Sequence, residues 1–379
     1  MIYTASPVIE DEEINAVLDV LKSGMLVENK YARQLEEEFS KYIGTKYATV
    51  TTSGTTALHV ALEAAGIQPG DEVITTPFTF IASSNAILFV GGIPVFADID
   101  PETYNIDPES IKKKITPKTK AIMPVHIFGL PADMKAIMEI AEEHNLLVIE
   151  DCAQAHGATI DGKKVGSFGD IAAFSFYATK NMMSGEGGIV LTNNEEMIET
   201  AKAVKNHGRG AHGGYHYYRI GYNFRMMDLV AAIAVNQLKK LPKFLDARRK
   251  NVEHLVDIIG DLDGIKIQKE PKGYRSAWHV FGPRLTTNKI SRDKLIEELR
   301  NADIGARTLY SIPCYAQPAY KDIQNWRWAK FVKYPDYSKV SCPNAELVGN
   351  EHFELPIHPR VSDDQIEYIG TTLKKILTK

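Results

Sequence analysis

The chain has 379 residues, of which 44% are hydrophobic and 24% are charged. This composition is that of an ordinary globular protein and excludes collagen-like, coiled-coil and low-complexity classes. The chain has 44 Lys and Arg residues against 48 Asp and Glu residues, a net charge of −4. Because this charge gives no overall positive field, we expect a globular protein that does not bind nucleic acid.

The cysteines and the apolar segments indicate the cellular compartment of the protein. Cys152, Cys314 and Cys342 are odd in number and far apart, which is typical of neither a disulfide framework nor a zinc site. The N-terminus has no basic region followed by an apolar one. The longest apolar runs, such as 230–235, are well short of the ~18 residues that a membrane span needs. We therefore expect a cytoplasmic protein with no membrane contact.

In chain order, two stretches with a helical period come first, at residues 14–21 and 35–43. Strands and helices then alternate. The predicted strands are 47–52, 71–75, 93–96, 121–125 and 146–150, and the predicted helices between them are 55–65, 79–89 and 132–144. The last of these strands is almost uninterrupted in its apolar character, which is typical of a sheet covered on both faces. The pattern predicts an α/β fold, a three-layer sandwich with a mainly parallel sheet.

The second half of the chain begins with the same alternation and then changes. The predicted elements are strands 172–176 and 188–191, helices 195–205, 226–239 and 244–258, a strand at 277–283, and helices 292–302 and 363–377. Helix 244–258 is long and charged enough to connect two domains. We predict a large domain over 1–250, which includes the N-terminal helices, and a smaller C-terminal α+β domain over 251–379.

Acidic and amide side chains follow the predicted strand 146–150. Asp151 comes at the end of this strand, and Gln154 lies three residues beyond it. In open α/β sheets, ligands bind at the carboxyl ends of the parallel strands. We therefore expect Asp151 and Gln154 to contact a ligand.

A hydroxyl group and a lysine belong to the next predicted strand and the loop after it. Ser175 lies near the strand end, and Lys180 comes five residues later, before the Gly-rich run 184–188. A lysine amine can hold pyridoxal phosphate (PLP) as a Schiff base, and a carboxylate such as that of Asp151 can face the pyridine nitrogen. These residues indicate a site for this cofactor, with Lys180 and Asp151 as its catalytic residues.

The segment 52–58, Thr-Ser-Gly-Thr-Thr-Ala-Leu, joins a predicted strand to a predicted helix. Backbone amides at a helix start, together with hydroxyl groups, form a site for an anion such as the cofactor phosphate. Gly54 lets the backbone approach such a group closely. Ser and Thr also form ordinary helix N-caps, so the segment alone leaves both interpretations open. Its combination with Ser175 and Lys180 favours the phosphate site.

The sequence resembles the DegT/DnrJ/StrS family of PLP-dependent nucleotide-sugar aminotransferases over essentially the whole chain. The blocks that carry the resemblance are 52–58, 77–80, 94–100, 150–157, 175–180, 185–188, 206–208, 221–226, 315–320 and 355–359. So many blocks in the same order are hard to obtain by chance. The resemblance implies fold type I and an aminotransferase activity.

The resemblance also implies roles for residues around the cofactor ring. Lys180 would carry the cofactor as a Schiff base, and Asp151 would pair with the pyridine nitrogen. Phe80 would stack on the ring, and Gln154 would bond to its phenolic oxygen. A protonated ring nitrogen is the electron sink of PLP chemistry, which agrees with a carboxylate at this position.

The cofactor phosphate would be held from two sides. The resemblance implies that Gly54, Thr55 and Ser175 of the same chain bind it. Asn223, in the block Gly-Tyr-Asn, would reach it from the second subunit. This implies a homodimer with shared active sites.

The segment 207–222 is rich in Gly, His, Arg and Tyr and interrupts the regular pattern. His207, Arg209 and Tyr217 are our candidates for substrate contacts, because such side chains meet phosphates and sugar hydroxyls. The resemblance implies that the substrates are L-glutamate and a nucleotide-linked keto-deoxysugar, in amino-sugar and polysaccharide biosynthesis. His207, His212 and His216 are loosely spaced, without nearby Cys or acidic residues, and we expect no metal there.

Three alternatives remain at this stage. The protein could be an aminotransferase for a cyclitol or another keto substrate. It could be a PLP-dependent dehydratase, but that branch replaces the Schiff-base lysine by histidine, so Lys180 argues against it. It could also be a regulatory protein that binds PLP without turnover, although Asp151, Gln154, Ser175 and Lys180 are all present.

Overall fold

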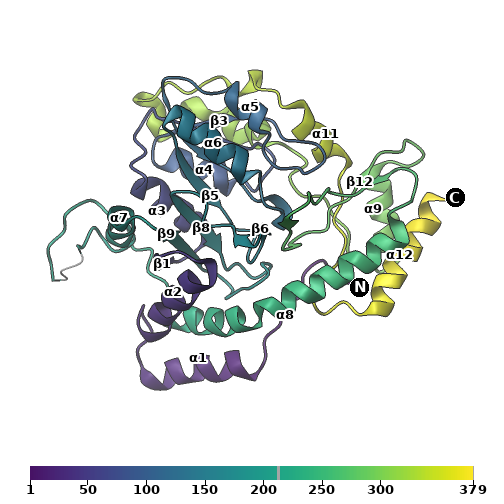
Figure 1. Ribbon diagram of the computed structural model, residues 1–379, viewed down its shortest axis with the longest axis horizontal. Coiled ribbons are helices and arrows are strands. Elements are labelled where there is room, and N and C mark those ends of the chain that lie inside the picture. The colour runs from purple at the N-terminus through teal and green to yellow at the C-terminus, as the bar shows by residue number, and fades with distance from the viewer. Residues whose placement is uncertain (211–213, 379) are drawn as a thin grey trace.

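The computed structural model describes residues 1–210 and 214–378 (Figure 1). A central sheet of seven strands carries helices on both faces. In spatial order its strands are β1 (Tyr47–Thr51), β9 (Gly188–Thr192), β8 (Ile171–Ser175), β5 (Leu147–Asp151), β4 (Thr119–Met123), β2 (Glu72–Thr75) and β3 (Ile93–Phe96). Strands β3, β2, β4, β5 and β8 run parallel, and β9 runs antiparallel to both of its neighbours. The predicted α/β sandwich with a mainly parallel sheet is confirmed.

Twelve α-helices accompany the sheet in the described part of the chain. They are α1 (Asp11–Ser23), α2 (Lys30–Ile43), α3 (Gly54–Ala64), α4 (Ala82–Phe89), α5 (Pro108–Lys112), α6 (Met134–His144), α7 (Glu195–Lys205), α8 (Asp228–Ile259), α9 (Arg292–Asn301), α10 (Pro318–Lys321), α11 (Pro343–Glu351) and α12 (Asp363–Leu377). The short strands β6 (Thr159–Ile160), β7 (Lys163–Lys164) and β11 (Tyr274–Arg275) form one small sheet, and β10 (Ile265–Lys266) and β12 (Arg284–Leu285) form another.

Side chains that alternate along each strand build a separate core on each face of the sheet. In β5, Ile149 packs into a cluster with residues of α3, α4 and α7, whereas Val148 packs into a cluster with residues of α6. Successive side chains of a strand point to opposite faces. The strands are apolar without alternation because both faces are covered. This arrangement decides which strand-end side chains share a face, and so which of them meet in a site.

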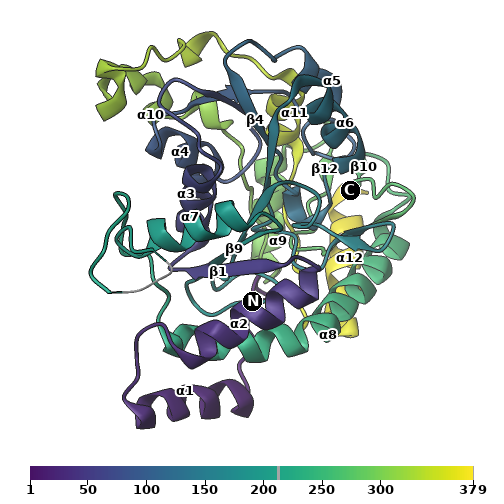
Figure 2. The ribbon, with the colours of Figure 1, turned by 60° about the vertical axis from the view of Figure 1, so that its left-hand side comes forward.

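The predicted helices 226–239 and 244–258 are wrong as two elements, because the chain forms one helix, α8, with Pro242 inside it. Proline removes a backbone hydrogen bond and normally ends or kinks a helix. Here the apolar spacing continues through it, with Leu238, Leu241 and Phe244 all buried. Helix α8 packs along α1, α2 and α12, and Figure 2 shows it in the lower part of the molecule, with α1 below it. Tertiary packing outweighs the local effect of the proline.

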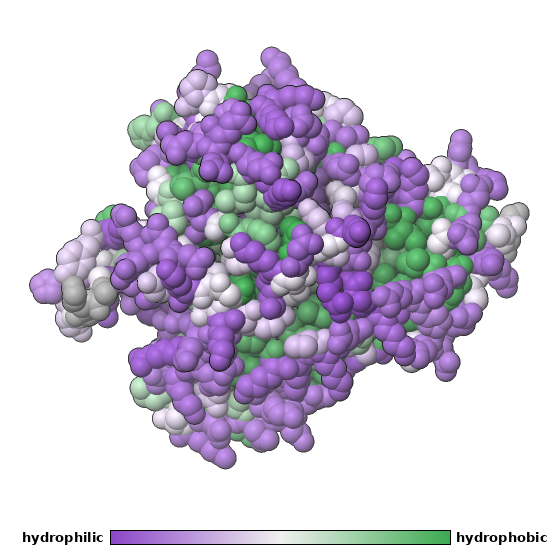
Figure 3. Space-filling model, viewed as in Figure 1, coloured by the Kyte–Doolittle hydropathy of each residue, from purple (hydrophilic) through white to green (hydrophobic). Residues whose placement is uncertain are grey.

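The C-terminal part of the chain packs around the second half of α8. Its core joins α8 to residues of α9 and α12, and Figure 3 shows hydrophobic side chains gathered near α9. The predicted strand 277–283 is wrong: Trp278 has a positive φ of 44°, which breaks an extended run, and only Phe281 forms a bridge, to Leu355. The predicted domain boundary at residue 250 falls within α8 and stays a prediction.

The segment after α7 extends away from the sheet as an arm, visible at the left of Figure 1. Its described residues are 207–210 and 214–222. Two backbone hydrogen bonds join its two ends, from the His207 amide to the Tyr222 carbonyl (2.7 Å) and from the Tyr218 amide to the Gly208 carbonyl (2.9 Å).

No helix among the described residues is both long and apolar enough to cross a membrane.

Candidate active site

A cavity of about 530 Å³ lies at the carboxyl ends of the central strands. Strand β5 ends in Asp151 and β8 ends in Ser175. Strand β1 runs parallel to β8, because both are antiparallel to β9, so the turn from β1 into α3 reaches the same edge. The loop between β2 and α4 also opens there. The topology therefore brings four chain segments, far apart in sequence, around one cavity.

Asp151 is buried on the cavity wall, with 3% of its surface exposed. Its Oδ2 accepts a hydrogen bond from the Ser83 hydroxyl (2.7 Å) and its Oδ1 accepts one from the Ala153 amide (3.1 Å). Burial raises the pKa of this carboxyl above its usual value, and the two hydrogen bonds and the charge of Lys180 oppose that shift only in part. A cationic group in the cavity would restore the ionised form.

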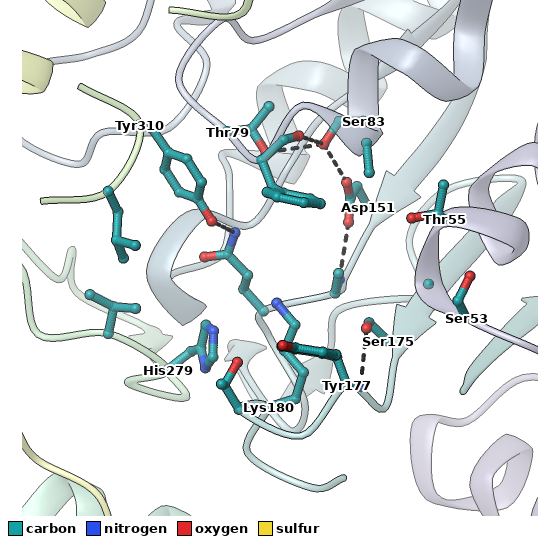
Figure 4. A pocket seen from close by; sticks show the side chains of 18 of the residues that line it. Ser53, Thr55, Thr79, Ser83, Asp151, Ser175, Tyr177, Lys180, His279 and Tyr310 are labelled. Atoms are coloured by element: carbon teal, nitrogen blue, oxygen red, sulfur yellow. Dashed lines mark hydrogen bonds between the residues drawn. The ribbon is translucent and has the colours of Figure 1, made fainter. Parts of the chain in front are cut away.

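Lys180 lies on a loop that is fixed at both ends after β8. The Ala178 amide donates to the Gly185 carbonyl (2.9 Å), and the Lys180 amide donates to the Tyr177 carbonyl (2.9 Å). Figure 4 shows the Lys180 side chain pointing into the cavity, on the side where Asp151 lies. Desolvation lowers the pKa of its amine to about 8, and the nearby Asp151 carboxylate limits the shift. A larger neutral fraction makes this amine a better nucleophile than an ordinary lysine.

The start of α3 forms a cradle for an anion. Ser53 caps the helix, since its hydroxyl accepts from the Thr56 amide (3.1 Å), while the amides of Gly54 and Thr55 make no hydrogen bond within the described residues. The hydroxyl of Ser175 faces the same space. A Cβ on Gly54 would lie 2.5 Å from the Ser175 Cβ, so only glycine lets α3 approach β8 this closely. Free amides, hydroxyls and a helix N-terminus suit a phosphate.

Phe80 and Gln154, both predicted from the sequence, also line the cavity. Phe80 is 59% exposed, so its ring is available to cover a planar ligand. Gln154 is held in place by the protein: its Oε1 accepts from the Phe128 amide (2.9 Å), and its Nε2 donates to the Tyr310 hydroxyl (3.2 Å). One hydrogen on this Nε2 remains for a ligand.

Four predicted residues are not at the cavity of their own chain. Asn223 is exposed and forms a bridge with Asn206 beside the arm. His207 is exposed at the base of the arm. Arg209 lies over the Tyr217 ring, 5.7 Å from its centre, so these two side chains contact each other within the arm.

Several side chains of the site were not predicted from the sequence. Ser83 is the second residue of α4 and donates to Asp151. His279, Arg307, Tyr310 and Glu354 come from the C-terminal part of the chain and also line the cavity. Figure 4 shows His279 and Tyr310 on the side away from Ser53 and Ser175. All four lie in segments without regular strands or helices, where no periodicity or motif predicts which side chain faces a site.

One group of side chains could hold a metal by proximity alone. A ring nitrogen of His126, a carboxylate oxygen of Glu150 and the Cys152 sulfur lie within 4.8 Å of one another, all buried. The His126 Nδ1 accepts from the Ala132 amide (3.0 Å), and its Nε2 pairs with Glu150 (3.0 Å). Because both ring nitrogens are occupied, this group is structural. His212 lies outside the described residues.

The residues present fit pyridoxal phosphate. They offer a lysine of lowered pKa, a buried carboxylate to which no cation of the described chain donates a hydrogen bond, and an anion cradle with free amides, all on one cavity. The fold and the site therefore define a PLP-dependent enzyme. The chain belongs to the DegT/DnrJ/EryC1/StrS aminotransferase family, whose model matches residues 7–374. This confirms the predicted family, the aminotransferase activity and the cofactor.

Individual relatives agree with this classification. The chain is 35% identical to GDP-perosamine synthase of Vibrio cholerae, over 99% of this chain and 98% of that protein. It is 36% identical to the UDP-N-acetyl-3-dehydro-alpha-D-glucosamine 3-aminotransferase of Acidithiobacillus ferrooxidans, over 97% of this chain and 95% of that protein. The structure is similar to NtdA from Bacillus subtilis with bound PMP, with a TM-score of 0.88 and 29% identity over 98% of this chain and 83% of that chain.

Proposed function

We propose that the protein transfers the amino group of L-glutamate to the keto carbon of a nucleotide-linked keto-deoxysugar, in amino-sugar biosynthesis in the cytoplasm. The observation that carries this proposal is the single cavity on which Lys180, Asp151 and the start of α3 meet. Two relatives support the substrate class, since their names specify a GDP-linked and a UDP-linked amino sugar.

In this proposal, Lys180 holds the cofactor covalently and, once released, moves a proton between the donor's α-carbon and the cofactor. When bound, PLP withdraws electrons from the carbon that loses its proton. The lowered pKa of Lys180, about 8, supports this role, because part of the amine is neutral near pH 7 and accepts a proton. Asp151 faces the ring nitrogen and keeps it protonated by opposite charge.

The remaining residues of the cavity bind and orient. Gly54, Thr55 and Ser175 hold the phosphate through amides and hydroxyls at the start of α3. Phe80 stacks on the cofactor ring. Gln154 donates its remaining hydrogen to the phenolic oxygen.

We also propose a homodimer in which Asn223 reaches the phosphate in the partner's site, and His207, Arg209 and Tyr217 contact the partner's substrate. The support is that these residues are remote from their own cavity, on and beside an arm that extends from the sheet. The arm also exposes large apolar side chains: Ile220 is 90% exposed and Tyr215 is 83% exposed. Such surface is usually covered by a partner.

The substrate is tested with a panel of UDP-, GDP- and dTDP-linked keto-sugars, each incubated with L-glutamate and the enzyme, with mass analysis of the products. We expect one nucleotide-linked sugar to gain an amino group. The free keto-sugar lacks the nucleotide and its remote binding energy, so its kcat/KM should be lower by roughly 100-fold or more. A preference for a free cyclitol or a simple keto acid would overturn the substrate class and leave the aminotransferase activity intact.

The shared site is tested with hybrid dimers. Inactive Lys180→Ala subunits are mixed with inactive Asn223→Ala subunits under conditions of demonstrated subunit exchange. Each hybrid should contain one site with both substitutions and one site with neither, so activity should return. An active monomer, or hybrids without activity, would overturn the shared site.

A further inference from the structure

The cavity contains a cationic side chain that the proposed function leaves without a role. Its charged lining residues in the described chain are Asp151, Lys180, Glu186, Arg307 and Glu354. Lys180 is committed to the cofactor, so Arg307 is the remaining permanent cation among them. An amino acid donor brings an α-carboxylate into this cavity, and a carboxylate in a partly desolvated site needs a charged partner.

Arg307 is fixed in position by one neighbouring strand-like segment. The Glu354 amide donates to the Arg307 carbonyl (2.8 Å), and the two residues form an antiparallel bridge. The Arg307 Nε also donates to Oε2 of Glu354. Its two terminal nitrogens have no hydrogen-bond partner within the described residues, and 45% of the side chain is exposed.

Glu354 is suited to orient this guanidinium. Its side chain is only 4% exposed, and burial raises the pKa of its carboxyl, with the Arg307 charge opposing the shift. The buried Glu354 carboxylate, which accepts from Nε, fixes one edge of the planar guanidinium. The other edge, with both terminal nitrogens, then points its donors away from Glu354, in the geometry that binds a carboxylate through two parallel hydrogen bonds.

The position of Arg307 separates it from the cofactor phosphate. Burial, together with nearby charges that include Arg307, lowers the pKa of His279, so Arg307 lies close to His279. His279 and Tyr310 lie across the cavity from Ser53 and Ser175 in Figure 4. The Lys180 side chain lies between the two sides. A donor whose amine meets the cofactor beside Lys180 would therefore have its α-carboxylate within the half of the cavity that Arg307 lines.

We propose that Arg307 binds the α-carboxylate of the amino donor and that Glu354 is its positioning residue. This rests on the proposed amino transfer, but it holds for any α-amino acid donor and needs no particular sugar. The rival role for Arg307 is to bind a phosphate of the nucleotide-linked acceptor. The two roles act in different half-reactions.

The experiment follows each half-reaction in a single turnover, by the visible absorbance of the cofactor. Arg307→Gln should slow the reaction of the pyridoxal form with L-glutamate by roughly 10- to 100-fold in kcat/KM, because two charge-assisted hydrogen bonds are lost. The reaction of the amine form with the sugar should change less than about threefold. Arg307→Lys keeps the charge without the fork and should fall between the two. Arg275→Gln, an exposed arginine paired with Asp246 outside the cavity, should match the wild type.

Binding without turnover gives a second readout. Titration calorimetry with 2-oxoglutarate, which carries the α-carboxylate and has no amine to transfer, should show a Kd for the pyridoxal form roughly tenfold or more weaker in Arg307→Gln. Arg307→Gln leaves the buried Glu354 carboxylate without its charged partner, and the single variant could fail to fold. In that case the double variant Arg307→Gln with Glu354→Gln, in which both side chains are neutral, replaces it. The double variant should show the same loss.

Three outcomes would overturn the assignment. A defect confined to the sugar half-reaction would give Arg307 to the acceptor phosphate. A loss with L-glutamate but none with L-glutamine, which has the same α-carboxylate and a neutral side chain, would give Arg307 to the donor's side chain. Unchanged glutamate kinetics and 2-oxoglutarate binding would remove Arg307 from binding. If the nucleotide-sugar proposal is wrong, the sugar panel fails while the glutamate half-reaction still reports on Arg307.

Discussion

Glu150 and Asp151 are adjacent buried carboxylates at the end of one strand, and the protein uses them in opposite ways. Their side chains point to opposite faces of β5, Asp151 to the face of α4 and the cavity. Glu150 accepts four hydrogen bonds, from His126 Nε2 (3.0 Å) and from the amides of Gly166, Phe168 and Gly169 (2.8, 2.8 and 2.7 Å). Asp151 accepts two.

The difference in donors reverses the effect of burial on the two pKa values. Burial alone raises both. The His126 hydrogen bond and charge, with the backbone amides, turn this into a net lowering of the pKa for Glu150, whereas the pKa of Asp151 remains raised. A saturated carboxylate has nothing left to offer a ligand. A carboxylate with fewer donors is still open to a cationic ligand, such as the ring nitrogen in the proposed function, so the number of donors, and not the depth of burial, distinguishes the two acids.

Among the residues around the cavity, Lys180 should cause the largest loss of function when it is replaced. Lys180→Ala removes both the covalent tether and the proton carrier, so we expect kcat for amino transfer to fall at least about 1,000-fold. The wild-type protein should be yellow, and borohydride should fix the cofactor to the peptide that contains Lys180. Lys180→Ala with wild-type activity and the same visible band would refute the assignment.

Neutralising Asp151 and neutralising Glu150 should have different effects, the first on activity and the second on stability. Asp151→Asn should keep the cofactor but lower kcat by roughly 100-fold or more, since an amide cannot keep the ring nitrogen protonated. Glu150→Gln places an amide donor against four donors and should destabilise the fold by ~2–4 kcal/mol, with kcat of the folded fraction nearly unchanged. Denaturant melts and steady-state kinetics on both variants test the contrast.

The pH dependence of the cofactor-free protein tests the same contrast by sign. The raised pKa of Asp151 means that its stabilising contribution is present below its unfolded pKa and is lost as the pH rises through the folded value. At pH 7, cofactor-free Asp151→Asn should therefore be more stable than the wild type. The lowered pKa of Glu150 has the reverse sign, so the deficit of Glu150→Gln should shrink as the pH falls below about 4.5. Equal pH profiles for the two variants would contradict the different roles.

The lowered pKa of Lys180 should also show in the rate at which the cofactor-free protein binds added cofactor. Only a neutral amine attacks the cofactor aldehyde, so the rate of reconstitution should rise about tenfold per pH unit and level off near pH 8, the pKa that desolvation gives this amine. A lysine of ordinary pKa would continue to rise to about pH 10. Stopped-flow absorbance from pH 6 to pH 10 distinguishes the two.

The sequence predicts the side of the cavity that the strand ends form better than the rest, because strand ends are predictable. Asp151 follows one apolar run and Ser175 lies near the end of another, both typical of buried strands, and parallel topology then places the strand ends together. Helix α8 was missed as one element because Pro242 dominates local propensity, whereas its continuous apolar face is decided by α1, α2 and α12. Local sequence carries no information on such long-range packing.

The C-terminal wall could not be predicted for a related reason. Arg307 and Glu354 are separated by 47 residues and meet through one isolated bridge, which no periodicity signals. Asn223, which we propose to face the partner subunit, came only from the resemblance to a family. Ser83 lay within a predicted helix, but its direction toward Asp151 depends on where α4 begins, which is at residue 82 and not at the predicted 79.

The smallest expected effect is at Ser83, and it refines the contrast between the acids. Its hydroxyl donates to Oδ2 of Asp151 and also lies 3.0 Å from the Thr79 hydroxyl, so it links α4 to the carboxylate. Ser83→Ala leaves Asp151 with one protein donor, a loss of ~1 kcal/mol of support, and kcat should fall about threefold to tenfold. The substitution should change the orientation of the Asp151 carboxylate more than its charge. The visible band of the bound cofactor should therefore shift slightly, while the affinity of the protein for the cofactor stays within about threefold of the wild type. Ser84→Ala is the matched control. Ser84 is the next residue of the same helix, and its hydroxyl donates to the Ile81 carbonyl and not to Asp151. If the two variants lose activity equally, the hydrogen bond from Ser83 does not position Asp151, and the single amide of Ala153 is sufficient.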